Sequence, residues 1–307
     1  MDRYFYRIYG LTVVSDFRLD EAESIAEPES PDVTIRQAFF SEEIISEEVQ
    51  QKFSDDVRCF ETIGMQWSRM IYSEVGVFHS AGGNLIEYQL LDGYKCTTAS
   101  QIILSWCFST LFIQRRELAI HGSAVIYNGK MMLISGESGS GKSTLTAEYL
   151  SHGARFMSDD IVRIVLDDQG RLVGCPAYPQ RKLCPDAVKQ YQIDQNDLIE
   201  MYDTVKEKYA VRNKEQYHDH PEIIDAMIVI EKKETEKVSA VEVQGGDKLK
   251  LIMQNLFNLD AYKQCNLSTV VFTQCLKLAQ QIRIICVQRP VNGITVSEQI
   301  SCIETVL

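Results

Sequence analysis

One short stretch constrains this chain more than any other: residues 136–144 read Gly-Glu-Ser-Gly-Ser-Gly-Lys-Ser-Thr. The stretch fits the pattern G-x-x-x-x-G-K-[ST], and the flanking residues 131–134 and 142–152 predict a strand before it and a helix after it. Glycines let consecutive backbone N–H groups curl around an anion, and the N-terminus of a helix adds partial positive charge. The stretch therefore predicts a phosphate-binding loop between a strand and a helix.

Every position of this loop is expected to contribute to nucleotide binding. The residues concerned are Gly136, Glu137, Ser138, Gly139, Ser140, Gly141, Lys142, Ser143 and Thr144. Lys142 would reach the β- and γ-phosphates, and Ser143 would hold Mg²⁺. The plainer alternative is a Gly/Ser turn that only caps a helix. Nucleotide binding is favoured because the flanking strand and helix are where the pattern needs them.

Composition limits the classes of function. The chain has 307 residues, of which 45% are hydrophobic, so a packed core is expected in one large or two ordinary domains. A net charge of −12 argues against a general binder of nucleic acid or of an anionic membrane. The nine cysteines never form C-x-x-C, which favours reduced thiols over a disulfide framework or a cysteine zinc site. The first ten residues lack an apolar signal region, and a cytoplasmic protein is expected.

The first third of the chain has the pattern of a small β-rich domain. The runs with strand character are residues 4–9, 11–14, 33–35, 70–78 and 85–90. Residues 41–53 suggest a short surface helix, and residues 102–113 a buried one. A boundary near Lys95 would divide the chain into a β-rich domain, residues 1–95, and a larger α/β domain, residues 96–307.

A hairpin leads into the phosphate loop. Two β-like runs, residues 118–127 and 130–135, are separated by Asn128-Gly129, the strongest short-range signal for a two-residue type I′ turn. Counting back from that turn places His121 opposite Gly136. A histidine is thereby brought to the mouth of the phosphate loop, although a hydrogen-bonded core histidine is the equally weighted alternative.

An acid pair follows the loop helix. Residues 154–157 predict a short strand that ends at Ser158-Asp159-Asp160. A right-handed crossover to a neighbouring parallel strand would put these carboxylates at the same sheet edge as the phosphates. Because successive side chains of an extended segment point to opposite sides, we expect different roles: Asp159 as general base and Asp160 with Ser143 on the metal. The alternative is a solvated turn at a strand end.

Three later features complete the expectations. Arg181 and Lys182 stand in a Pro-punctuated loop, where they could neutralise a transferred phosphate or simply be solvated. His218-Asp219-His220 has a spacing that could suit a metal, but no further ligand set presents itself in the sequence. The remaining predicted elements are a hairpin over 161–166 and 171–173, strands at 226–230, 238–243 and 283–288, and helices at 198–208, 247–258, 269–278 and 296–306.

The order of three motifs resembles a known family. His121-Gly122-Ser123-Ala124, then the phosphate loop, then Ser158-Asp159-Asp160 resemble the catalytic core of the HPr kinase/phosphorylase family, whose fold is related to phosphoenolpyruvate carboxykinase. The opening Tyr6-Arg7-Ile8-Tyr9-Gly10-Leu11 is closer to the HPr kinase-like kinases found with ribosomally made peptides, notably lasso-peptide precursor kinases. The chain lacks the glycine-rich signature and the basic C-terminal loop that accompany phosphatase activity and HPr docking in true HPr kinases.

The resemblance implies an α/β P-loop kinase domain of HPr kinase type behind a smaller β-rich N-terminal domain. It implies an ATP- and Mg²⁺-dependent phosphotransferase that acts on a serine hydroxyl of a peptide or small protein, without nucleic-acid or membrane partners. The expected catalytic residues are His121, Lys142, Asp159 and Asp160, with Arg181 added to the nucleotide site. Two alternatives stay open, a non-catalytic nucleotide-binding regulator and a kinase of a small metabolite hydroxyl; a homo-oligomer is also left open.

Overall fold

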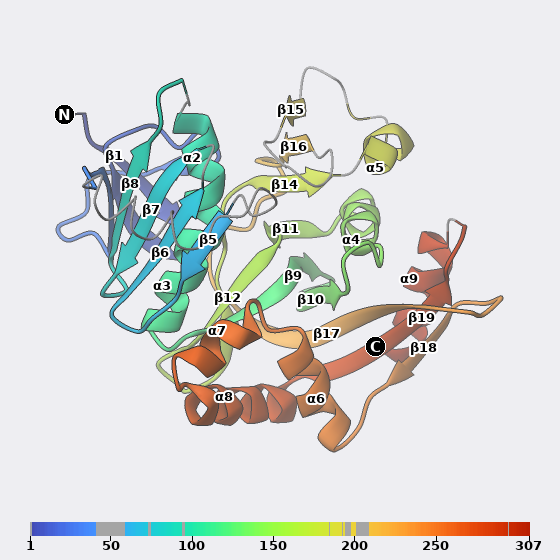
Figure 1. The fold of residues 1–307 in the computed structure, drawn as a ribbon. Helices are drawn as coiled ribbons and strands as arrows, with labels where there is room; N and C mark the ends of the chain where they lie inside the picture. Colours follow the sequence, from blue (N-terminus) through green and yellow to red (C-terminus); the bar gives the residue numbers. More distant parts are fainter. Residues whose placement is uncertain are drawn as a thin grey trace. The chain divides into compact units, whose positions relative to one another are not determined.

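The chain forms two compact units, which are described separately. The structure is a computed structural model that describes residues 2–40, 59–72, 75–93, 96–183, 185–191, 193, 198–200, 209–293 and 295–307. One unit comprises Met1–Glu117 with Asp260–Ser268, and the other Leu118–Leu259 with Thr269–Leu307 (Figure 1). Within the described part, no helix combines the length and the apolarity needed to cross a membrane.

The first unit is built on a sheet of eight strands. They are β1 (Tyr4–Ile8), β2 (Leu11–Ser15), β3 (Glu23–Ser24), β4 (Val33–Gln37), β5 (Cys59–Thr62), β6 (Trp67–Tyr72), β7 (Gly76–Ala81) and β8 (Leu85–Leu90). Their order in the sheet is β3-β1-β2-β4-β8-β7-β6-β5. The β-rich character predicted for this part of the chain is confirmed. The single strand expected over residues 70–78 is instead split between β6 and β7, and the helix expected over 41–53 lies outside the described residues.

A long buried helical segment belongs to this first unit. It consists of α2 (Cys96–Ile102), the π-helical turn η1 (Ile103–Cys107) and α3 (Phe108–Gln114). The Tyr9 hydroxyl donates a hydrogen bond to the Leu104 carbonyl at 2.8 Å, and Thr110 donates to Ser80 at 2.9 Å. The first stretch of this unit therefore runs to Glu117, beyond the boundary expected near Lys95, because the apolar helix packs against the N-terminal sheet.

The second unit mixes strands and helices. Its strands are β9 (Leu118–Tyr127), β10 (Lys130–Gly136), β11 (Arg155–Ser158), β12 (Ile161–Leu166), β13 (Leu172–Gly174), β14 (Gln180–Leu183), β15 (Leu198–Glu200), β16 (Tyr209–Arg212), β17 (Glu222–Lys233), β18 (Ser239–Glu242) and β19 (Arg283–Pro290). Its helices are α4 (Lys142–Ser151), α5 (Pro185–Gln190), α6 (Gly246–Gln254), α8 (Ser268–Gln281) and α9 (Val296–Val306), while α7 (Leu259–Gln264) falls at the division between the units.

The hairpin ahead of the phosphate loop has the predicted turn and register. Asn128 and Gly129 have φ angles of 50° and 73°, the left-handed conformations that a type I′ turn requires. The ladder of β9 and β10 runs from Tyr127 opposite Lys130 to Gly122 opposite Ser135. The predicted register is confirmed over this whole ladder.

The placement of β11 differs from the prediction. β11 pairs antiparallel with β9, so β9 lies between β10 and β11, and β11 is not the direct neighbour of the loop strand. Since both β10 and β11 run antiparallel to β9, they still point the same way, and their carboxyl ends lie at one edge. The parallel pairing of β10 with β17 closes β10, β9, β12, β13 and β17 into a ring of strands.

Two predictions in the middle of the chain are wrong. Gln180–Leu183 is strand β14 of a three-stranded sheet, so Arg181 and Lys182 lie on a strand and not in a loop. Residues 198–200 form strand β15 where a helix was expected, and residues 201–208 lie outside the described part. Strand pairing supplies the reason, since β14 and β15 both pair with β16.

The hydrophobic core of the second unit holds α4, the helix that follows the phosphate loop, in place. α4 and α9 pack side by side on one face of the sheet, and α6 and α8 lie on the other side (Figure 1). Leu145, Tyr149 and Leu150 of α4 join buried side chains of β10, β17, β19 and α9 in one cluster. Each fully buried side chain of this size contributes about 1.5–3 kcal/mol to folding. The helix that follows the phosphate loop is thus anchored by its buried face.

Candidate active site

The loop between β10 and α4 has a backbone that only glycine accommodates well. Gly136 has φ 139°, and a Cβ built there would lie 2.4 Å from the Ile230 carbonyl oxygen of β17. Gly141 precedes the first residue of α4 with φ 112°. Both values lie in the region that L-residues rarely adopt. The chain therefore turns sharply into the helix and leaves its first N–H groups at the mouth of the loop, an arrangement suited to an anion.

Two cations lie against this loop. The Lys142 ammonium donates to the carbonyls of Gly136 at 2.7 Å and Glu137 at 3.2 Å. Arg289 of β19 donates from Nε to the Ser140 carbonyl at 2.8 Å. Nothing in the sequence pointed to Arg289, because β19 comes almost 150 residues after the loop. Both cations raise the local positive charge where an anion would bind.

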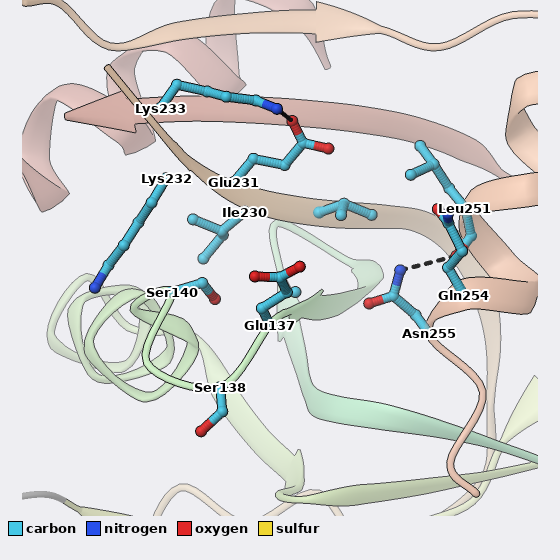
Figure 2. Close-up of a pocket in the computed structure, with 12 residues that line it drawn as sticks. Glu137, Ser138, Ser140, Ile230, Glu231, Lys232, Lys233, Leu251, Gln254 and Asn255 are labelled. Atoms are coloured by element: carbon cyan, nitrogen blue, oxygen red, sulfur yellow. Dashed lines mark hydrogen bonds and ion pairs between the residues drawn. The ribbon is translucent and has the colours of Figure 1, made fainter. Parts of the chain in front are cut away.

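A pocket of about 460 Å³ opens beside the loop. Its walls are the loop, the end of β17 over Val229–Lys233 and the α6 end over Leu251–Asn255, with the Glu137 side chain between them (Figure 2). Figure 2 also shows Lys232 extending toward Ser140. The volume lies within the usual range for small-molecule sites, about 300–1,000 Å³.

The acid pair sits in a turn held by the neighbouring strands. Asp159 accepts hydrogen bonds from Ser123 Oγ at 2.8 Å and from the Lys182 backbone N–H at 2.7 Å. Asp160 accepts from Lys182 Nζ at 2.8 Å and has φ 71°. The left-handed turn at Asp160 replaces the extended geometry expected for the pair, so strand alternation does not decide which way each carboxylate points.

Lys182 connects both acids and is largely enclosed. Burial lowers the pKa of Lys182 and the Asp160 carboxylate raises it, with a net upward shift. The ammonium therefore stays charged at neutral pH and holds Asp160 in place. Ser123 lies two residues after His121 on β9, so strand alternation places both side chains on the same face. This spacing could have identified Ser123 as a site residue from the sequence.

His121 lies between the acid pair and the phosphate loop. Its Nδ1 is 3.2 Å from the Asp160 carbonyl oxygen and 3.8 Å from Asp160 Oδ1. It also lines a hollow of about 280 Å³ together with Gly136 and Glu137. Burial lowers the pKa of His121, and the Lys142 charge lowers it further. The imidazole is thus neutral near pH 7, and it contacts the acid pair and faces a hollow that the phosphate loop also lines.

Asn255 ties the strands of the site together. Its carbonyl accepts from the His121 N–H at 2.8 Å, and its side-chain oxygen accepts from Ser135 Oγ at 2.7 Å. The Ser135 hydroxyl is also 2.6 Å from the His121 carbonyl. Asn255 ends α6, far along the chain, and no local motif marks it in the sequence.

Arg181 is buried near Asp159. The residue is 8% exposed, and Nε and Nη1 make no hydrogen bond within the part of the chain that the structure describes. Burial lowers the pKa of Arg181, while the charges of Asp159 and Tyr191 act in the opposite direction. A buried guanidinium with unused donors is suited to an anionic oxygen.

In the second unit, a mixed α/β fold brings a glycine-rich loop, a histidine and an acid pair together at one edge of the sheet. This combination defines the class of protein. The family model described as HPr Serine kinase C-terminal domain matches residues 114–184. Over this segment the chain is similar to HPr kinase-like proteins.

Individual proteins are also similar to part of this chain. The HPr kinase/phosphorylase of Streptococcus thermophilus (strain ATCC BAA-491 / LMD-9) is 34% identical over 88 residues, 29% of this chain and 28% of that protein. That of Bacillus subtilis (strain 168) is 46% identical over 56 residues, 18% of either chain. The chain thus aligns with less than a third of these relatives' lengths. The solved Hpr(Ser) kinase/phosphatase from Coxiella burnetii is 13% identical, with TM-score 0.33 over 61% of this chain and 89% of that one, and carries no weight here.

Proposed function

We propose that this protein is an ATP- and Mg²⁺-dependent kinase that phosphorylates a serine hydroxyl of a peptide or small protein. The observation that carries the proposal is the position of His121, which contacts the Asp159-Asp160 turn and lines a hollow with the glycine-rich loop. A loop for phosphates beside two carboxylates offers the parts of a phosphoryl-transfer site. The relatives named HPr kinase/phosphorylase support the same reaction class.

The nucleotide would be held by the loop residues from Gly136 to Thr144. Backbone N–H groups at the start of α4 and the Lys142 ammonium would bind its phosphates. The fit is supported by the backbone of Gly136, where a Cβ would collide with β17, and by the adjoining pocket. Arg181 would add donors for the transferred group.

Ser143 and Asp160 would hold the metal. Mg²⁺ prefers such oxygen ligands, and when bound it neutralises charge on the phosphates. Asp159 would accept the proton of the attacking serine hydroxyl, with its orientation fixed by Ser123 and Lys182. The neutral His121 would hold the Asp160 turn against the loop.

The acceptor we propose is a ribosomally made precursor peptide of the lasso type, and the setting is the cytoplasm. The described cysteines Cys107, Cys175, Cys265, Cys275, Cys286 and Cys302 are free thiols, as is usual in a reducing compartment. The net charge of −12 fits a partner other than nucleic acid.

Mass spectrometry of precursor peptides incubated with the protein, ATP and Mg²⁺ tests the proposal. A gain of one phosphate on a serine is expected, and Lys142→Ala should abolish it. Precursor peptides that stay unmodified while serine-containing small proteins are phosphorylated would refute the acceptor but keep the kinase. ATP binding without transfer to any acceptor would instead favour a nucleotide-binding regulator.

A further inference from the structure

A second cluster of polar side chains lies outside this site, on the segment that leads into β17. It consists of His218, His220 and Glu222, whose ligand atoms all lie within 4.8 Å of one another. The residues are spaced two apart, and in extended chain such positions share one side. The structure adds Glu222 to the two histidines, so the cluster has a third ligand beyond the histidine pair of the sequence analysis.

Two of the three separations between ligand atoms, those from Glu222, are close to the values around a tetrahedral metal. Glu222 Oε1 lies 3.1 Å from His218 Nε2 and 3.6 Å from His220 Nε2. Zinc bonds to imidazole nitrogen and carboxylate oxygen measure about 2.0–2.1 Å, so neighbouring ligand atoms around one tetrahedral zinc are about 3.3 Å apart. The two observed separations lie on either side of that value.

The histidines are prepared to act as ligands. His218 is 2% exposed, and neither of its ring nitrogens makes a hydrogen bond of acceptable geometry among the described residues. A buried ring nitrogen without a hydrogen bond destabilises a fold unless a ligand occupies it.

A carboxylate also orients the second histidine. Asp219 Oδ1 lies 2.9 Å from His220 Nδ1 and can accept its proton, which leaves Nε2 facing Glu222. Metal-bound histidines usually donate their other ring nitrogen to such a carboxylate. The cluster therefore has the ligands and also the supporting contact that such sites use.

The cluster is remote from the phosphate loop within the second unit. Glu222 begins β17, whereas Ile230 of β17 pairs with Gly136. Eight residues of strand separate them, about 26 Å at roughly 3.3 Å per residue. The segment is also fastened to β11, since Phe156 donates to the Gln216 carbonyl and accepts from the His218 N–H, both at 2.7 Å.

We propose that His218, His220 and Glu222 bind one zinc ion, with a water molecule as the fourth ligand. The ion would fasten the segment before β17 to β11 and so stabilise the fold, without taking part in phosphoryl transfer. Two imidazoles favour zinc over Mg²⁺, which takes oxygen ligands. The zinc site is therefore separate from Ser143 and Asp160, which would hold Mg²⁺ under the proposed function.

Calorimetric titration of the metal-free, full-length protein with ZnCl₂ in excess MgCl₂ tests this proposal. One zinc per chain is expected, and Co²⁺ in its place should give the visible absorption of a tetrahedral complex. His220→Ala and Glu222→Gln should weaken binding by about tenfold or more. Both residues are partly exposed, so these variants should fold even where a change at buried His218 does not.

His152→Ala is the matched control, because His152 is a partly exposed histidine that lies 3.7 Å from Glu148. It should bind zinc as the wild type does. Zinc should raise the melting temperature of the wild type and of the control, but not that of His220→Ala. A wild type that binds no zinc, or a His220→Ala variant with unchanged affinity, would overturn the proposal.

Discussion

Replacing Asp159 by Asn tests its role as general base while keeping its hydrogen bonds. Asp159 accepts one hydrogen bond on each oxygen, from Ser123 Oγ and from the Lys182 N–H. Asn can keep both contacts, because its carbonyl oxygen can accept from the Lys182 N–H while its amide donates to the Ser123 hydroxyl. The variant should therefore fold and bind ATP nearly as the wild type does, and lose only the group that accepts a proton.

The expected loss in transfer rate equals the contribution that a positioned general base usually makes to that rate. Transfer should fall about a hundredfold or more, which corresponds to about 2.7 kcal/mol in the activation free energy. Single-turnover transfer from radiolabelled ATP measures this step, and calorimetry measures ATP affinity separately. A parallel fall in ATP affinity or melting temperature would mean that Asp159 acts through structure.

The Asp160→Asn variant, compared with Asp159→Asn, distinguishes the roles of the two acids. It removes the ion pair with Lys182 and the carboxylate on the metal side, so it should raise the Mg²⁺ concentration needed for transfer. An exchanged pattern, in which Asp159→Asn raises the Mg²⁺ requirement, would reverse the two roles. If both variants retain full transfer at ordinary Mg²⁺, the kinase proposal fails and the nucleotide-binding regulator replaces it.

Three further changes test the site. Lys142→Ala should weaken ATP binding or turnover severely in calorimetry and transfer assays, while Lys130→Ala, on an exposed lysine of the hairpin, should not. Gly136→Ala should cost about 1–3 kcal/mol in denaturant unfolding and disrupt ATP binding, because its Cβ would meet a β17 carbonyl; unchanged stability would contradict the close approach of the loop to β17. Burial lowers the folded-state pKa of His121 and of His218, so the unfolded chain binds more protons, and stability should fall as pH drops through about 6.5. In metal-free buffer, the melting temperature of His121→Gln should fall less over this pH range than that of the wild type. A pH profile identical to that of the wild type would show that His121 does not contribute.

Local signals in the sequence determined the hairpin and the loop. Asn128-Gly129 specifies the turn of the hairpin because both residues tolerate positive φ. The turn then fixes the register of the β9–β10 ladder, which brings His121 toward Gly136. The glycines and Lys142 likewise specify a strand, a loop and a helix through short-range constraints. The class of fold and most residues of the candidate site followed from these stretches.

Contacts between distant segments were decided only by the tertiary structure. The helix from Cys96 belongs to the first unit because its apolar face is buried there, a fact that composition does not reveal. Lys182 meets Asp160 only because Gln180–Leu183 pairs with β16 and becomes a strand.

The same distinction explains Arg289 and Asn255. Each meets its partners through the pairing or packing of strands and helices that are far apart in the chain, and no periodicity or turn residue records that pairing. Sequence therefore determined the pieces with strong local signals, the hairpin and the glycine-rich loop, and where they turn. The tertiary structure decided which side chains from different pieces meet, because those contacts depend on the burial of whole faces and not on neighbouring residues.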